Sequence, residues 1–237
     1  EAVKYYQHFI NQGFNDHRVF CNYGAILKDL GNLKEAELLQ RKAIKLKFDF
    51  SDAHYNLAGI LKDLGKLQKA EISIRKAIEL KPDFSDAYYN LAYLELLNGN
   101  YKSGLEYFEF RFKKKDIPYI HGKPKIERAD NNKFEKGEKI LIISEQGLGD
   151  TLQYMRYIPY LRTIGFDISF CAQTKLHSLI KSSGIDQHPL TPEQANLVSE
   201  GKWIPLLSLP RYLKVRQDNP IISEPYLHST DELNQKW

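Results

Sequence analysis

The first half of the chain spaces its apolar residues as amphipathic helices do, and the whole pattern repeats. The segment from Ser51 to Gly65 matches the segment that begins at Ser85, at an offset of 34 residues. Asparagines and glycines keep the same step, at Asn22, Asn56 and Asn90 and at Gly31, Gly65 and Gly99. We therefore predict units of two amphipathic helices of about 13 residues each, joined at the glycine and stacked to bury their apolar stripes.

Small residues also recur at steps of 34 residues. They are Gly24, Ala58, Ala92, Ala36, Ala70, Gly104, Ala43 and Ala77. This pattern with a 34-residue period resembles the tetratricopeptide repeat. The resemblance implies a partial repeat and three full repeats over residues 1–115, with a concave groove for a peptide or protein partner. Because the chain begins mid-repeat and without methionine, we expect it to be a fragment or a processed form.

The recurring asparagines have two interpretations. Asparagine is a mediocre helix former, yet it occupies the same place in the first helix of each full repeat. Either each amide bonds a neighbouring helix end, or Asn22, Asn56 and Asn90 form a ladder that binds a peptide backbone. The ladder resembles the one in the repeats of O-linked N-acetylglucosamine transferase. Three tyrosines would add aromatic area to the groove or serve as ordinary packing: Tyr55, Tyr89 and Tyr93.

The hydrophobic pattern changes in the second half. Residues 140–143 form a continuous apolar run, as expected for a strand buried on both faces of a parallel sheet. Glycines at 147 and 149 then allow a tight turn into a helix, whose apolar residues lie at Leu152, Met155, Ile158 and Leu161. Further strands are expected over 166–171 and 203–207, with a helix over 175–183. We predict a Rossmann-like parallel α/β domain over residues 138–237, joined to the repeats by a linker over 116–137.

Two common nucleotide-binding motifs are excluded at this turn. The third glycine of a dinucleotide fingerprint would fall at Leu152, and no acidic residue follows the next strand. The Gly-Lys-Ser/Thr of a phosphate-binding loop is also missing from the turn.

A second resemblance covers nearly the whole chain. The repeats, the aromatic segment 104–112, the run Glu145-Gln-Gly-Leu-Gly-Asp-Thr-Leu-Gln153 and the later Leu206-Leu-Ser-Leu-Pro210 together resemble bacterial repeat-containing glycosyltransferases. Their transferase part is similar to the heptosyltransferase-like group with the two-domain GT-B fold. The resemblance implies that residues 138–237 are the acceptor-side domain and that the donor is a nucleotide sugar. Since the sequence stops before a donor-binding domain, we expect this chain to bind no cofactor and to be inactive alone.

The same resemblance assigns roles in the glycine loop. Asp150 is the candidate base that takes the proton of the acceptor hydroxyl; alternatively, it is a helix N-cap. Arg156 would face a phosphate or form a salt bridge, and Glu145 is either an alternative base or polar surface at a strand end. Four further residues would line the acceptor cleft: Gln146, Gly147, Gly149 and Thr151.

Composition narrows the kinds of protein and site that the sequence can represent. The net charge of +4 is mild and spread along the chain, which argues against nucleic-acid binding. Cys21 and Cys171 lie far apart and indicate neither a disulfide framework nor a zinc site, so we expect a cytoplasmic protein. No metal-ligand cluster is visible, and no apolar run approaches the ~20 residues of a membrane helix.

The alternative function is a non-catalytic interaction scaffold with a degenerate α/β domain. The donor sugar, the acceptor class, the peptide partner and the oligomeric state are left open.

Overall fold

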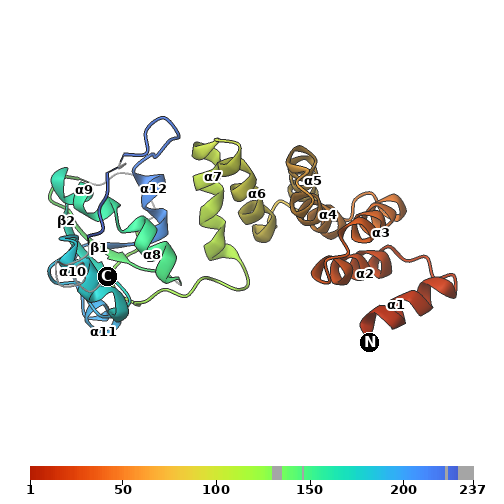
Figure 1. The fold of residues 1–237 in the computed structure, drawn as a ribbon, viewed down its shortest axis with the longest axis horizontal. Coiled ribbons are helices and arrows are strands. Elements are labelled where there is room, and N and C mark those ends of the chain that lie inside the picture. The colour runs from red at the N-terminus through yellow and green to blue at the C-terminus, as the bar shows by residue number, and fades with distance from the viewer. Residues whose placement is uncertain (130–134, 146, 222–223, 229–237) are drawn as a thin grey trace, which may run out of the picture. The chain divides into compact units, whose positions relative to one another are not determined.

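The computed structural model describes residues 1–129, 135–145, 147–221 and 224–228 (Figure 1). The chain forms two compact units, Glu1–Lys115 and Asp116–Trp237.

The first unit is made of successive helix pairs (Figure 1). Its elements are α1 (Ala2–Asn11), α2 (His17–Asp29), α3 (Leu33–Leu46), α4 (Ser51–Asp63), α5 (Leu67–Leu80), α6 (Ser85–Leu97), α7 (Tyr101–Phe108) and the 3₁₀ helix η1 (Glu109–Lys113). We call α2, α4 and α6 the first helices and α3, α5 and α7 the second helices. The first unit therefore has a leading helix followed by three helix pairs.

Each hairpin turns at a glycine in the left-handed conformation. Gly31, Gly65 and Gly99 have φ values of 80°, 72° and 80°. In each turn the glycine N–H and the next N–H bond carbonyls of the preceding helix, for example Gly65 to Lys62 at 2.9 Å and Lys66 to Leu61 at 2.8 Å. These bonds satisfy carbonyls that a helix end leaves open, and the backbone geometry favours glycine. The turn therefore explains the glycine period in the sequence.

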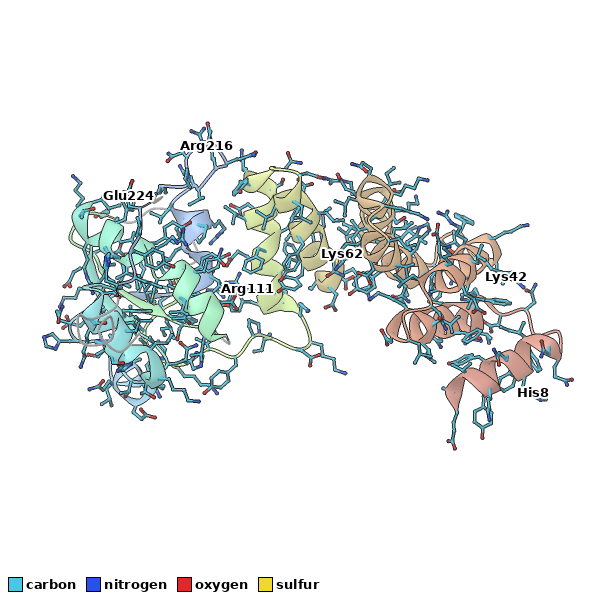
Figure 2. All side chains as sticks on the ribbon, in the orientation of Figure 1. His8, Lys42, Lys62, Arg111, Arg216 and Glu224 are labelled. Atoms are coloured by element: carbon cyan, nitrogen blue, oxygen red, sulfur yellow. The ribbon has the colours of Figure 1, made fainter. Side chains whose placement is uncertain are left out.

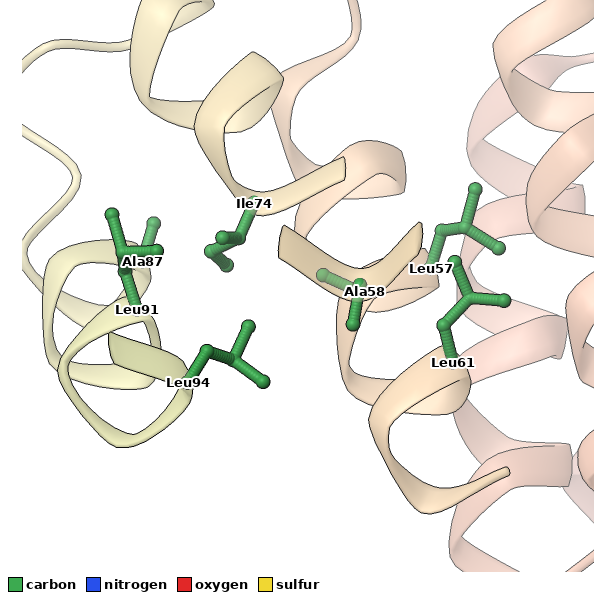
Figure 3. Packing of buried hydrophobic residues seen from close by; sticks show 8 residues of the cluster. Leu57, Ala58, Leu61, Ile74, Ala87, Leu91 and Leu94 are labelled. Atoms are coloured by element: carbon green, nitrogen blue, oxygen red, sulfur yellow. The ribbon is translucent and has the colours of Figure 1, made fainter. Parts of the chain in front are cut away.

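Alanines allow the helices to approach closely. Ala36, Ala43, Ala70 and Ala77 on the second helices are fully buried. Figure 3 shows the core where α4, α5 and α6 meet. Its buried members are Leu57, Ala58, Leu61, Ala70, Ile74, Ala87, Leu91 and Leu94. Because the core lies between neighbouring repeats, one hairpin alone would leave its apolar stripe in water.

The second unit is built on a parallel sheet of the order β2-β1-β3. The strands are β1 (Lys139–Ile143), β2 (Asp167–Cys171) and β3 (Lys202–Pro205). The helices are α8 (Leu148–Tyr154), α9 (Tyr157–Thr163), α10 (His177–Ser182), α11 (Pro192–Asn196) and α12 (Leu209–Tyr212), with 3₁₀ turns η2 (Thr174–Leu176) and η3 (Leu206–Ser208). Four consecutive residues of β1 are buried, as expected for a central strand covered on both faces. The predicted fold class, helical hairpins followed by a parallel α/β region, is confirmed.

The helix predicted after β1 is two helices. The structure ends α8 at Tyr154 and begins α9 at Tyr157. Pro159 explains the break, since it has no N–H to donate to the carbonyl of Met155 and its ring crowds that carbonyl. The apolar spacing continues across the break, with Met155, Ile158 and Leu161 all buried. The hydrophobic periodicity alone therefore did not predict that the helix is interrupted.

Within residues 116–129, two residues pair with the strand region of the second unit. Ile120 forms an antiparallel bridge with Glu145, and Arg128 forms a parallel bridge with Trp203. The N–H of Ala129 donates to the carbonyl of Trp203 at 3.0 Å. This part of the segment predicted as a linker therefore contributes to the α/β unit.

Candidate functional site

The predicted asparagine ladder lies on the first helices. Asn22 is exposed, whereas Asn56 and Asn90 are half-buried. The amide of Asn56 donates to the Cys21 sulfur at 3.3 Å, and the Asn90 side chain interacts with the phenol of Tyr55. Each of these partners lies 35 positions earlier, in the middle of the preceding first helix. The amides of Asn56 and Asn90 therefore connect successive first helices through side chains.

The amides keep binding capacity beyond these contacts. A primary amide offers two donors and an acceptor oxygen with two lone pairs, and the contact of Asn56 with Cys21 uses one donor. Burial raises the pKa of the Tyr55 phenol, and the negative charge of Asp86 raises it further, while Asn90 opposes both. Tyr55 therefore stays a neutral hydroxyl at physiological pH, able to donate as well as accept.

The aromatic side chains predicted for the groove lie mainly in the third repeat. The hydroxyls of Tyr89 and Tyr93 are 2.7 Å apart, and both rings lie beside Phe108. The Lys114 ammonium lies 4.6 Å from the centre of the Tyr89 ring. Tyr55 is half-buried, as Tyr89 is, and packs against Phe84 at a ring distance of 4.8 Å beside the core of α4, α5 and α6. Tyr89 and Tyr93 thus form a cluster with one exposed member, whereas Tyr55 packs against that core.

The structure adds Lys28 and Gly59 to this face. A Cβ at Gly59 would lie 3.5 Å from Cε of Lys28, so the lysine side chain runs along α4 at this glycine. The Lys28 ammonium reaches the carboxylate of Asp63 at 3.7 Å. A glycine in the middle of a helix is costly, and that cost was the signal in the sequence that could have identified the position.

In the second unit, Asp150 is exposed and does not cap a helix. The N-cap of α8 is Gly147, which places Asp150 in the first turn of the helix. The N-cap interpretation is therefore wrong: the helix begins at Leu148, earlier than the sequence suggested. A Cβ at Gly147 would lie 3.0 Å from the Asp150 carboxylate, so this glycine leaves room for the acid. Gly149 has open space around its Cα, and Gln146 lies outside the described residues.

Thr151 is fully buried and holds the loop from inside. Its hydroxyl lies 3.1 Å from the Gly147 carbonyl and 2.9 Å from Oε1 of Gln173. The Gln173 amide in turn donates to the Glu145 carbonyl at 3.2 Å. The Thr151 hydroxyl thus bonds within the loop. Gln173, two residues after the end of β2, positions this loop, a role that the sequence pattern did not indicate.

Glu145 and Arg156 also differ from expectation. Glu145 is buried, and its carboxylate accepts a hydrogen bond from the Leu207 N–H at 3.2 Å, so it is not polar surface. Arg156 donates to the Gln153 carbonyl at 2.8 Å and stacks over the Tyr226 ring at 4.7 Å. Among the residues that the structure describes, Arg156 has no ion pair, so the expected salt bridge is not found there.

Within the described residues, no group of three or more His, Cys, Asp and Glu side chains is placed to hold a metal ion. The helices described there are all too short or too polar to cross a membrane.

Comparison with known families identifies the repeats. Sequence models of the tetratricopeptide repeat match residues 17–50 and 51–84, and a further model of the same repeat matches residues 74–106. Residues 17–106 are therefore tetratricopeptide repeats, and a small parallel α/β region follows them in the chain. None of these matches supports the resemblance to glycosyltransferases. A search of curated proteins found no match.

Several solved structures are similar to about half of the chain. A crystal structure of MamA is 22% identical, with a TM-score of 0.44, over 48% of this chain and 66% of that one. YrrB, described as a TPR protein with an unusual peptide-binding site, is 21% identical, with a TM-score of 0.42, over 47% of this chain and 57% of that one. PilF of Pseudomonas aeruginosa is 20% identical, with a TM-score of 0.42, over 44% and 48%. The chain thus spans less than two thirds of the length of each of them.

Proposed function

We propose that the chain is a protein-interaction scaffold whose first helices bind an extended peptide segment of a partner. The repeats supply the binding face, and Asn22, Asn56 and Asn90 supply hydrogen bonds to the peptide backbone. The Tyr89 and Tyr93 cluster adds apolar contact area at the third repeat.

One observation carries this proposal: the same amide recurs on three successive first helices and is at least partly exposed each time. An extended peptide presents N–H and C=O groups at regular intervals, and an amide can pair with either. The contacts of Asn56 with Cys21 and of Asn90 with Tyr55 hold two of these amides in place. Such preorganisation lowers the entropy cost of binding.

The test uses a peptide selected against the full chain from a random library displayed on phage. Replacing all three asparagines by alanine should weaken its binding by about tenfold or more, since each neutral hydrogen bond contributes ~0.5–1.5 kcal/mol. The control variant replaces three exposed asparagines elsewhere in the repeats, Asn11, Asn32 and Asn100. Fluorescence anisotropy gives the affinities, and circular dichroism checks the fold. Equal affinity of the two triple variants would refute the ladder.

Glycosyl transfer is a second candidate, favoured by the position of Asp150. The chain passes from β1 to β2 on one side and then to β3 on the other, so the strand order reverses at β1. Ligands of open α/β sheets bind beside the carboxyl ends of strands at such a point. Asp150 lies in the turn that follows this end of β1 and is exposed, as a base for an acceptor hydroxyl must be.

This candidate requires a parent protein that also supplies a nucleotide-sugar domain. There, Asp150→Asn should lower turnover by ~10²–10⁴-fold. Stability should change by no more than about 1 kcal/mol, because Asp150 contributes only its charge near the helix start. Transfer from radiolabelled nucleotide sugars measures the rate, and residues 1–237 alone should show none. Undiminished turnover in the Asp150→Asn parent would exclude the assignment and leave the scaffold function standing.

A further inference from the structure

Basic residues gather on the second helices. The segments Leu33–Lys47 and Lys66–Lys81, which contain α3 and α5, each carry five basic and two acidic residues. The first helix between them differs, since α4 has one basic and two acidic residues. Figure 2 labels one basic residue of a second helix, Lys42 on α3, and the basic residue of α4, Lys62. The segments that contain α3 and α5 therefore carry more positive charge than α4 does.

Two exposed apolar residues repeat on the same helices. Leu38 on α3 is 68% exposed, and Ile72 on α5 is 71% exposed. They are 34 residues apart and so occupy equivalent places in consecutive repeats, whereas the third repeat has Glu106 there. Exposing a large apolar side chain forgoes about 1.5–3 kcal/mol of burial. The repetition of this feature makes it a property of the two helices rather than of one residue.

A pocket of about 660 Å³ lies between these helices. Leu57 and Ser73, both buried, form part of its wall together with Ile44 and Ile72. Basic side chains at the pocket come from both second helices: Arg41, Lys45, Arg75 and Lys76. The volume is within the usual ~300–1,000 Å³ of a ligand pocket, and every residue that lines it belongs to the first unit.

The basic residues of the pocket are not equally available. Arg41 pairs with Glu37 at 2.8 Å, Arg75 with Glu71 at 2.9 Å, and Lys76 with Glu79 at 2.6 Å. Lys45 is exposed and has no ion pair within the described residues. These intramolecular pairs fix the arginines at the rim, and Lys45 is left to attract a negative partner.

We infer that this pocket is a second docking site, which takes an acidic segment of a partner protein through an apolar anchor side chain. Acidic groups of the segment face Lys45 and the rim arginines, and its apolar side chains cover Ile72 and enter the pocket. A recess with an apolar wall favours such a segment over nucleic acid, whose phosphates offer no apolar anchor. The site is independent of the asparagines, because Asn22, Asn56 and Asn90 do not line it.

The test uses the full chain and a fluorescent synthetic peptide with leucines on one helical face and glutamates on the other. We expect saturable binding that weakens with added salt. One control peptide has serine for leucine and another has lysine for glutamate; both should bind at least about tenfold more weakly. Amide chemical-shift changes in the complex should centre on α3 and α5.

Matched variants locate the site. Lys45→Glu should weaken binding by about tenfold, whereas Lys69→Glu, an equal charge change at an exposed position of α5 outside the pocket, should have little effect. Ile72→Ser should also weaken binding, and its control is Leu97→Ser, at a residue that is 68% exposed on α6. The triple asparagine variant should bind normally. Unfolding midpoints confirm that each variant is folded.

Three outcomes would overturn the inference. Equal losses from Lys45→Glu and Lys69→Glu would mean attraction by net charge alone. Self-association in sedimentation experiments that Lys45→Glu abolishes would make the occupant a second copy of the chain. Binding to phosphatidylglycerol vesicles, lost in Lys45→Glu, without peptide binding would make it a lipid surface.

Discussion

Gly24 leaves room in α2 for the buried side chain of Gln40. A Cβ at Gly24 would lie 2.6 Å from the Gln40 amide nitrogen, which donates to the Cys21 carbonyl at 2.8 Å. The oxygen of this amide, Oε1, is buried and has no hydrogen-bond partner within the described structure. The equivalent pair in the second repeat is Ala58 with Ile74. Two repeats thus solve one packing problem with different residue pairs.

Gly24→Ala should therefore lower stability, although alanine is the better helix former. Overpacking typically costs about 1–3 kcal/mol, against a gain of ~1 kcal/mol in helix propensity. Adding Gln40→Ile to this variant should restore stability, because it reproduces the second repeat and removes an unsatisfied polar atom. Urea unfolding measures both variants. A Gly24→Ala protein more stable than the wild type would show that Gln40 moves aside freely.

Cys171 makes the free energy of unfolding depend on pH. Burial, together with the smaller effect of the Glu193 charge, raises the pKa of this thiol to about 12. The unfolded thiol titrates near ~8.5, so the folded protein holds its proton more tightly. The contribution to stability is complete below the unfolded pKa and is lost as pH rises from there toward the folded pKa.

Cys171→Ala should therefore make stability less dependent on pH in the alkaline range. One titrating group contributes at most ~1.36 kcal/mol per pH unit. The unfolding free energy of the wild type should therefore fall with pH more steeply than that of Cys171→Ala, by up to this amount. Urea unfolding under reducing conditions at several alkaline pH values gives both slopes. Parallel slopes would mean that Cys171 is more accessible to water than its burial indicates.

At the scale of the element, the helical turns depend on backbone conformation alone. Nothing lies within 4 Å of a Cβ added at Gly65, yet its φ is +72°. Gly65→Ala should cost ~1–2 kcal/mol, because the left-handed conformation strains alanine. Gly65→Asn should cost less, since asparagine tolerates this region better. Thermal unfolding followed at 222 nm compares them, and equal losses would point to a contact instead of strain.

Local signals explain why most elements could be predicted from the sequence. The hairpins followed from glycine and alanine positions separated by 34 residues, and β1 from one apolar run. The break between α8 and α9 was missed because the apolar spacing continues past Pro159. The burial of Glu145 could not be predicted, since it depends on the Leu207 N–H, far along the chain. Local patterns define elements, whereas long-range contacts decide which loop residues are exposed.

At the scale of the whole molecule, the repeats and the α/β region are distinct compact units. Contacts within the repeats join neighbouring helices, so their stability is a sum of local terms. Residues 1–115 expressed alone should therefore retain their helical circular dichroism and a cooperative unfolding transition. Loss of helical signal in that fragment would show that the repeats require residues 116–237 in order to fold.

The contact made by each amide 35 positions back has a consequence for how the array can change in length. Asn56 contacts Cys21, and Asn90 contacts Tyr55. A tandem duplication of residues 51–84 would place the copied asparagine against the original Tyr55, and the copied tyrosine against Asn90. Each added copy would supply both the asparagine that contacts the preceding repeat and the tyrosine that contacts the following one. The copy number of the repeat could thus grow by duplication without the invention of a new interface.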